Sequence, residues 1–482
     1  MMDDKSKLLY NATAHIDESL IDDLVGEKAT EPSAQRKKLF GFERKLFIAA
    51  AAALLAVVMI AGAVAVSYRA PEPLKEPEPL TVEPFVGEAG DYTGASFMSI
   101  ADTTDTAQSV FSDRYYSVIQ TYRQSAKSLS AFFDKLTKKL IDGKSSAVVS
   151  PVNVYLALSM LAECTEGSSR RQILDLIGVN SIEELREQSK LIWLYNSRDD
   201  LLGRSLLGNS VWLSSSLPVK ESCTEVLKND HYASTFTGSF AHADYKNALK
   251  QWLSDQTGGL LDDCINALEI SDDTAAALVS TLYYKTQWQE GYDKTENGVF
   301  KSIYGNKDCV YNVKTVLSSI YRGSGFTAFR DMLADGNSVW FFLPDAGKSV
   351  EDLLKTDLCS FVKGGKASEA YNVTVRMPDF DVSFNASIKS VLKDLGVSDC
   401  MDPLKADFSA LTDDQLYVSR VIHAARFKAD KDGVEGAAYT VIDLTGGMPV
   451  EYQPYDFTLD RPFVFMVENG GAPLFVGTVV SV

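Results

Sequence analysis

The order of its periodic segments predicts an α+β fold for the larger, C-terminal part of this chain. Apolar residues recur at helical spacing in the earlier segments, over 117–142, 152–164 and 170–176. Segments with strand-like composition come later, at 277–285, 339–343, 372–377, 462–467 and 474–480. Helices first and strands afterwards is an order typical of an α+β domain, which we place at residues 108–482.

The composition is that of a folded protein with a sizeable core, since 45% of the 482 residues are hydrophobic and 23% are charged. The net charge of −18 argues against nucleic acid or anionic lipid as the main partner, because both favour a basic face. Six cysteines stand without CxxC or CxxxC spacing, at Cys164, Cys223, Cys264, Cys309, Cys359 and Cys400. They indicate neither a zinc site nor a redox pair, and we expect free, mostly buried thiols, although an even count permits disulfides.

A stretch of 21 uncharged residues at 46–66 is long enough to cross a membrane as a helix. Basic residues precede it, at Arg36, Lys37, Lys38, Arg44 and Lys45. The positive-inside rule then places residues 1–45 in the cytoplasm and the rest outside the cell. A cleaved signal peptide is the alternative, because residues 63–65 are small; however, the apolar run is longer than a signal core and the region before it is too long.

Residues 67–107 are predicted to form an extracytoplasmic stalk. Prolines alternate with glutamates in its first part, at Pro71, Pro73, Pro77, Pro79 and Pro84. Such a composition stiffens and extends a chain and does not build a core. The globular domain would therefore be held away from the membrane.

No motif for catalysis is evident. The four histidines are far apart in sequence, no G-x-S-x-G nucleophile turn is present, and there is no Walker or dinucleotide-binding fingerprint. Adjacent acidic residues at 262–263 and 413–414 are interpreted as solvated faces and not as catalytic pairs. An enzyme is disfavoured, and we expect no cofactor and no metal.

The last part of the chain carries a family resemblance. Residues 457–467 read FTLDRPFVFMV and residues 473–477 read PLFVG, which resembles the C-terminal signature of the serpins. Further similar segments follow the serpin order, at 149–151 (VSP), 283–285 (YYK), 377–380 (MPDF), 405–409 (KADFS) and 416–419 (LYVS). The resemblance covers nearly the whole outer domain, and the anchor suggests a membrane-bound, bacterial-type member.

The resemblance implies three β-sheets, eight or nine helices and an exposed reactive-centre loop. In inhibitory serpins a serine protease cleaves this loop and forms an acyl-enzyme, and the loop then inserts into the central sheet. The implied partner is thus a target serine protease, held covalently. The alternative is a non-inhibitory serpin, a binding or structural module whose loop is cut without trapping.

The loop would begin at a hinge formed by Gly433, Val434, Glu435, Gly436, Ala437 and Ala438. An inserting strand turns alternate residues to opposite faces. One alternating set is free of charge, namely Val434, Gly436, Ala438, Thr440, Ile442 and Leu444. If this set faces the core, Glu435 and Asp443 stay outside and no unpaired carboxylate is buried. Two departures favour slower insertion: Lys431 stands where inhibitors usually have an acidic residue, and Val434 where they usually have threonine or serine.

The bond to be cut is expected among Thr445, Gly446, Gly447, Met448, Val450 and Glu451. Counting forward from Gly433 points to Gly447 and Met448, whereas counting backward from Leu459 points to Glu451. No Arg or Lys lies between Lys431 and Arg461, so elastase-like or subtilisin-like proteases fit better than trypsin-like ones.

A second set of residues is expected where the sheet opens, namely Ser150, Asn153, Ser280, His423 and Trp288. The resemblance implies a serine where this chain has Asn153 and an asparagine where it has Ser280, so the amide and the hydroxyl are exchanged. We hypothesise that Asn153, Ser280 and His423 share one buried hydrogen-bond network, because the exchange keeps the same donors and acceptors.

Overall fold

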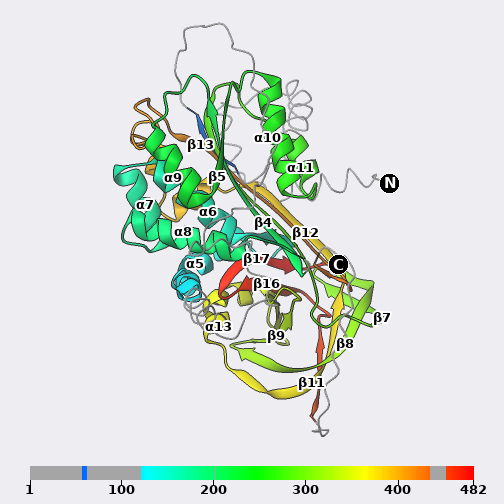
Figure 1. Ribbon diagram of the computed structural model, residues 1–482. Coiled ribbons are helices and arrows are strands. Elements are labelled where there is room, and N and C mark those ends of the chain that lie inside the picture. The colour runs from blue at the N-terminus through cyan, green and yellow to red at the C-terminus, as the bar shows by residue number, and fades with distance from the viewer. Residues whose placement is uncertain (1–56, 62–120, 201, 435–451) are drawn as a thin grey trace, which may run out of the picture.

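The structure is a computed structural model that describes residues 57–61, 121–200, 202–434 and 452–482 (Figure 1). It has the α+β architecture, with every strand segment that the sequence indicates. The cytoplasmic segment, the stalk and residues 435–451 of the loop lie outside the described residues.

Most of the helices lie in the first half of the described chain. They are α5 (Ser130–Leu140), α6 (Pro151–Cys164), α7 (Gly167–Ile177), α8 (Ile182–Asn196), α9 (Glu221–His231), α10 (Ala243–Gln256), α11 (Asp262–Asn266), α12 (Val350–Leu354), α13 (Leu358–Gly364), α14 (Lys389–Asp394) and the 3-10 helix η3 (Asp399–Met401). Residues 121–128 are helical as well, so the described part contains more helical segments than the eight or nine expected.

The strands are β1 (Val57–Ala61), β2 (Ala147–Val149), β3 (Arg198–Asp200), β4 (Gly203–Ser214), β5 (Ala233–Gly238), β6 (Thr274–Gln287), β7 (Lys294–Ser302), β8 (Gly305–Gly323), β9 (Phe326–Met332), β10 (Ser338–Pro344), β11 (Ala367–Pro378), β12 (Phe380–Ser387), β13 (Val418–Ala429), β14 (Gly433–Val434), β15 (Pro454–Thr458), β16 (Phe463–Asn469) and β17 (Ala472–Val479). Where three sheets were expected, hydrogen bonding joins these strands into two. The cause is β8, whose 19 residues pair with β7, β11 and β9 in turn and so connect strands that would otherwise form separate sheets.

The eight-stranded sheet is the one that matters for the loop. β12, β13, β6, β4 and β5 cross it in this order, and two short strands, β14 and β1, lie between β13 and β6 at opposite ends. β6 is buried on both faces: Ala276 and Leu278 join the main apolar core, whereas Ala277 and Val279 join a second core beneath α10. Alternate side chains of one strand thus fill two cores, as expected for a central strand covered by helices on both sides.

α6 is the buried helix behind this sheet. All of its residues are buried, and it contacts β6 and β17. Its start is set by the sequence: Ser150 caps the helix by accepting a hydrogen bond from the Asn153 N–H, and Pro151 occupies the first turn. This cap brings Ser150 and Asn153 to the back of the sheet.

β1 contains five residues of the predicted membrane segment 46–66. It pairs antiparallel with β6, from Val57↔Val279 to Ala61↔Thr274, and with β13. At these five positions the structure has a strand where the sequence predicts a helix, and the rest of 46–66 lies outside the described residues. None of the described helices is both long and apolar enough to cross a membrane.

Candidate functional site

The predicted loop begins inside the eight-stranded sheet. Gly433 pairs with Gln287 and Val434 with Thr286 on β6, while Val434 also pairs with Ala429 on β13. β14 therefore already lies between the two strands that an inserting loop would have to separate. Val434, the first member of the uncharged alternating set, is 1% exposed.

The remaining predicted loop residues lie outside the described residues. They are the hinge positions Glu435, Gly436, Ala437 and Ala438 and the candidate scissile positions Thr445, Gly446, Gly447, Met448, Val450 and Glu451. Their roles stay predictions.

The backbone at Gly433 admits no side chain. Its φ is +155°, and a Cβ there would lie 2.3 Å from the Thr286 carbonyl oxygen and 2.7 Å from the Gln287 Cα. Both neighbours are backbone atoms of β6, so neither can turn aside. Glycine is required because the loop approaches β6 this closely.

A turn held by Asp430 delivers the chain to β14. Its Oδ1 accepts hydrogen bonds from the backbone N–H groups of Asp432, at 2.9 Å, and of Gly433, at 3.3 Å. The Asp430 N–H in turn donates to the Gly433 carbonyl, at 3.0 Å. Sequence reasoning missed this residue, although an aspartate two residues before an Asp-Gly pair is a known turn signal.

Trp288 belongs to this end of the sheet and not to the network in which it was placed. Its Nε1 donates to the Asp430 carbonyl, at 2.8 Å, so the indole supports the turn. Lys314 Nζ lies 5.3 Å from the Trp288 ring centroid and 2.7 Å from Asp331 Oδ1, and Tyr292 donates to the same carboxylate. The correction follows from position: Trp288 comes eight residues after Ser280 along an extended strand, which rises about 3.3 Å per residue.

The other four predicted residues meet at the middle of the sheet. Ser280 on β6 donates to Asn153 Oδ1, at 3.2 Å. Asn153 N–H donates to Ser150 Oγ, at 3.4 Å, and Ser150 N–H donates to His423 Nε2 on β13, at 3.0 Å. All four residues are buried. The chain of bonds thus links β6 to β13 through the start of α6, with Ser150 as the connecting residue between Asn153 and His423.

His423 is held neutral in this network. Burial lowers its pKa from the usual 6.5 to about 4. Its Nε2 accepts the Ser150 N–H, so the ring proton of the neutral form sits on Nδ1, which has no hydrogen-bond partner among the described residues.

Between β14 and β1 the two long strands stand apart. β6 and β13 are not paired with each other in the described chain, and a small cavity opens between them. Its lining includes Ser150, Asn153, Ser280, Leu282, Ala424 and Arg426. Both polar and apolar side chains, among them the charged Arg426, thus line the path along which β14 would lengthen.

The far end of the loop lies in the other sheet. Asn372 N–H donates to the Gln453 carbonyl, and β15 then pairs in parallel with β11 from Asn372↔Pro454 to Arg376↔Thr458. Arg376 bonds Glu296 and Asp456, so this anchor also carries ion pairs. The two ends of the loop are therefore fixed in different sheets, one already inserted and the other attached to an edge.

This fold and this site define a protein whose large sheet already includes the start of its own loop, Gly433 and Val434, as a short strand. A family model described as "Serpin (serine protease inhibitor)" matches residues 127–482. The chain belongs to the serpin family, whose members are often serine protease inhibitors and are not enzymes.

Curated relatives and solved structures agree with this assignment. The chain is 26% identical over 403 residues to alpha-1-antiproteinase of Rattus norvegicus, covering 79% of this chain and 93% of the relative. It is 24% identical over 371 residues to a serpin-like protein of Methanosarcina acetivorans, covering 72% and 84%.

Among solved structures, the thermophilic serpin tengpin in its native state matches with a TM-score of 0.65 at 24% identity, over 74% of this chain and 94% of that one. Thyroxine-binding globulin, solved in complex with thyroxine, matches with a TM-score of 0.62 at 20% identity, over 74% and 98%. At these identities the two structures support the fold alone.

Proposed function

We propose that this chain is a suicide-substrate inhibitor of serine proteases. The observation that carries the proposal is β14: Gly433 and Val434 already pair with both β6 and β13. A loop that merely covered the surface would have no need of a glycine pressed against the β6 backbone or of a buried valine after it.

In the proposed mechanism the protease serine attacks a carbonyl within 445–451 and forms an acyl-enzyme. The new C-terminal piece stays attached through β15, while the piece that carries the protease is released from that edge. It can then extend β14 between β6 and β13, displacing β1 from the far end of that gap, and gains ladder hydrogen bonds on both sides. The protease is carried along the sheet, and the distortion of its active site traps the ester.

The proposed targets are elastase-like or subtilisin-like proteases. The support is the content of the loop, which is small and aliphatic around the candidate bonds and lacks Arg and Lys between Lys431 and Arg461. A trypsin-like pocket would find no basic side chain there.

We also propose that the inhibitor is anchored by a helix at 46–66, which requires residues 57–61 to leave β1, and displayed on the outside of a bacterial cell. The support is the uncharged stretch, the basic residues before it and the proline-rich stalk after it. There it would protect the cell surface from foreign proteases.

The second candidate is a non-inhibitory member that serves as a binding or structural module. Val434 favours it, because this position lacks the hydroxyl usual in inhibitors and slower insertion lets the acyl-enzyme hydrolyse first. The structural likeness to thyroxine-binding globulin is consistent with such a role for the fold.

The deciding experiment incubates the full chain, purified in detergent, with elastase-, subtilisin-, chymotrypsin- and trypsin-like proteases. An inhibitor gives an SDS-stable complex, and mass spectrometry of the released C-terminal peptide identifies the cut bond. Clean cleavage by every protease with no covalent complex would overturn the proposal in favour of the second candidate.

A matched pair of variants tests the direction of the loop. Ala438→Asp would bury a carboxylate on the inward face, whereas Ala437→Asp leaves its carboxylate on the outward face. We expect the first to raise the number of inhibitor molecules cleaved per protease trapped at least several-fold and the second to change it little. Equal effects would show that the alternation does not govern insertion.

A further inference from the structure

The gap between β6 and β13 holds one strand at each of its ends. β14 pairs with both long strands at one end, and β1 pairs with both at the other. All of these pairings are antiparallel, so β14 and β1 run in the same direction. Val279 is the last β6 residue to pair with β1 and Thr286 the first to pair with β14, which leaves residues 280–285 between them.

Hydrogen bonds behind the sheet attach both borders of this gap to the start of α6. Ser280 of β6 donates to Asn153, at 3.2 Å, and the Ser150 N–H donates to His423 of β13, at 3.0 Å. One buried helix thus holds the two strands, and β1 also contacts this helix. The gap is therefore a preformed place for a single strand.

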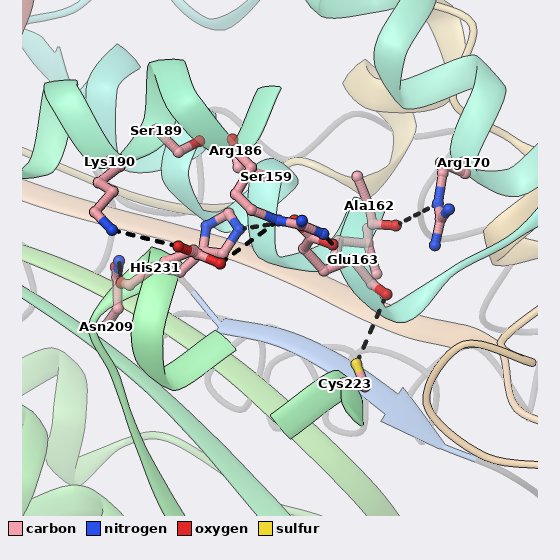
Figure 2. Close-up of polar contacts among 12 residues, drawn as sticks. Ser159, Ala162, Glu163, Arg170, Arg186, Ser189, Lys190, Asn209, Cys223 and His231 are labelled. Atoms are coloured by element: carbon pink, nitrogen blue, oxygen red, sulfur yellow. Dashed lines mark hydrogen bonds and ion pairs between the residues drawn. The ribbon is translucent and has the colours of Figure 1, made fainter. Parts of the chain in front are cut away.

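The end of α6 is fixed to the β6 side by a buried polar cluster (Figure 2). Glu163 accepts two hydrogen bonds from Arg186 of α8, each at 2.9 Å, and its Oε1 lies 3.2 Å from His231 Nε2 at the end of α9. The His231 carbonyl accepts from Asn209 Nδ2 of β4, at 2.8 Å, and β4 is paired with β6. The β6 border is thus attached to α6 at both ends of the helix.

On the β6 border, β1 lies where a later part of the loop would lie. Val434 pairs with Thr286. Ile442 comes eight residues after Val434, so β14 continued in the same register would bring Ile442 opposite Leu278, eight residues before Thr286. Val58 of β1 is paired with Leu278 in the structure.

The β13 border gives the same correspondence. Val434 pairs with Ala429, and Val421 comes eight residues before Ala429. Continued β14 would therefore bring Ile442 opposite Val421, and Val58 is the residue that is paired with Val421. Both borders agree that the N-terminal segment and the loop compete for one place.

This competition limits how far the loop can insert. Val57 pairs with Val279, the β6 residue that Val441 would face in the register of β14. While β1 is in place, the loop can insert only through residue 440. The candidate bonds at 445–451 lie beyond that point, so a protease attached to one of them would be carried only part of the way along the sheet.

Residues 57–61 also belong to the uncharged stretch 46–66, which is long enough to cross a bilayer as a helix. A spanning helix uses its backbone N–H and C=O groups for its own hydrogen bonds. In β1 the same backbone is paired with β6 and β13. The strand and the membrane helix therefore exclude each other.

We propose that residues 57–61 are a removable plug in the acceptor site of the loop, and that insertion of 46–66 into a lipid bilayer withdraws this plug. The occupancy of the site stands on the pairing of β1, whereas its effect on inhibition rests on the proposed function. Inhibition is thereby confined to chains that are anchored in a membrane.

The two states differ in the fate of the acyl-enzyme. With the plug in place the loop stops part-way and the protease keeps a working active site. Water then attacks the ester carbonyl, the cut loop leaves as a carboxylic acid and the protease serine regains its proton. With the plug withdrawn, the gap is open along its whole length, insertion is completed and the ester is trapped.

The first experiment asks only where the segment lies. In the full chain, M59C/A277C places cysteines at directly opposed positions of β1 and β6, where Cβ atoms lie about 5 Å apart. The variant is oxidised with glutathione disulfide, either in detergent-free buffer or in phosphatidylcholine vesicles, and mapped by mass spectrometry. We expect the cross-link in buffer and at least several-fold less of it in vesicles.

M59C/A276C is the matched control, because Ala276 belongs to the main core and Ala277 to the core on the other face of β6. It should cross-link poorly in both conditions. No M59C/A277C cross-link in buffer would overturn the plug, and equal cross-linking in buffer and vesicles would overturn its withdrawal by lipid. Either result would leave the proposed function untouched.

The second experiment measures inhibition. M59C/A277C is cross-linked in buffer, reconstituted in the same vesicles and mixed with an elastase- or subtilisin-like protease, with and without prior reduction by dithiothreitol. We expect the cross-linked form to be cleaved with at least several-fold less SDS-stable complex than the reduced form. Equal amounts of complex in both forms would overturn the plug's effect on insertion. If neither form gives any complex, as for wild type in vesicles, the proposed function fails instead.

Discussion

Ser280 of β6 donates a hydrogen bond to the amide oxygen of Asn153 at the start of α6, over 3.2 Å, with both side chains buried. In the proposed mechanism, this bond ties the strand that moves to the helix that stays behind. It is also the place where this chain exchanges the two side-chain types that the serpin resemblance implies.

The exchange is tested by a double-mutant cycle. Asn153→Ser and Ser280→Asn each leave a buried polar group without its partner, so each should lower the free energy of unfolding by about 1–3 kcal/mol. The double variant restores one amide and one hydroxyl and should recover at least half of the summed loss, as measured by urea unfolding. Additive losses would show that the two positions drifted independently.

Much of the hydrogen-bond network at the middle of the sheet could be predicted from the sequence, because the family resemblance fixes which positions correspond. The resemblance aligned Ser150, Asn153, Ser280 and His423 with positions known to lie together, so their proximity followed. The way in which Asn153 is connected to His423 could not be predicted. The connection runs through the backbone N–H of Ser150, and residue identity does not reveal a main-chain donor.

Other features were beyond sequence reasoning for physical reasons. The nine-stranded sheet is continuous because β8 extends past its partners and pairs with β7, β11 and β9. The length of a strand depends on this pairing, which composition does not reveal. The serpin resemblance concerns Lys431, the position that differs from the usual pattern, whereas its neighbour Asp430 holds the turn. Trp288 was grouped with Ser280 by closeness in sequence, yet eight residues of extended strand separate them.

The buried imidazole of His423 makes stability depend on pH. Its pKa is about 4 in the folded state and near the usual 6.5 when unfolded, so between these values the unfolded chain binds a proton that the folded chain does not. Stability is therefore complete above pH 6.5 and falls as the pH drops towards 4, by about 3 kcal/mol from this group.

The variant that isolates this effect is His423→Gln, which cannot titrate and can still accept the Ser150 N–H. The difference between wild type and variant in free energy of unfolding should shrink or reverse as the pH falls from 6.5 to 4. His242→Gln, at an exposed position, is the control. If the free energy of unfolding depends on pH in the same way in wild type and His423→Gln, the lowered pKa assigned to His423 is contradicted.

A side chain at position 433 should disrupt the pre-inserted strand. In Gly433→Ala the new Cβ meets the Thr286 carbonyl oxygen, so β14 must leave β6. We expect a loss of about 1–3 kcal/mol in free energy of unfolding, together with fewer trapped and more cleaved molecules in the protease assay. Gly291→Ala is the matched control, because a Cβ at that exposed glycine meets no atom within 4 Å. If both variants have the same free energy of unfolding and the same ratio of trapped to cleaved molecules, β14 has no part in the mechanism.

The Asp430 turn should control how firmly β14 is held. Asp430→Ala removes the oxygen that accepts from the Asp432 and Gly433 N–H groups and should cost about 1–2 kcal/mol. It should also speed amide hydrogen exchange at Val434, because the turn no longer presses the chain against β6. Asp430→Asn keeps an acceptor at the same place and should restore most of the protection. Lys431→Ala removes an exposed side chain that pairs with its neighbour Asp432 and should leave exchange at Val434 unchanged. If amide exchange at Val434 is as slow in Asp430→Ala as in wild type, the hydrogen bonds to β6 and β13 hold β14 without the turn. The sheet alone would then keep the start of the loop in place.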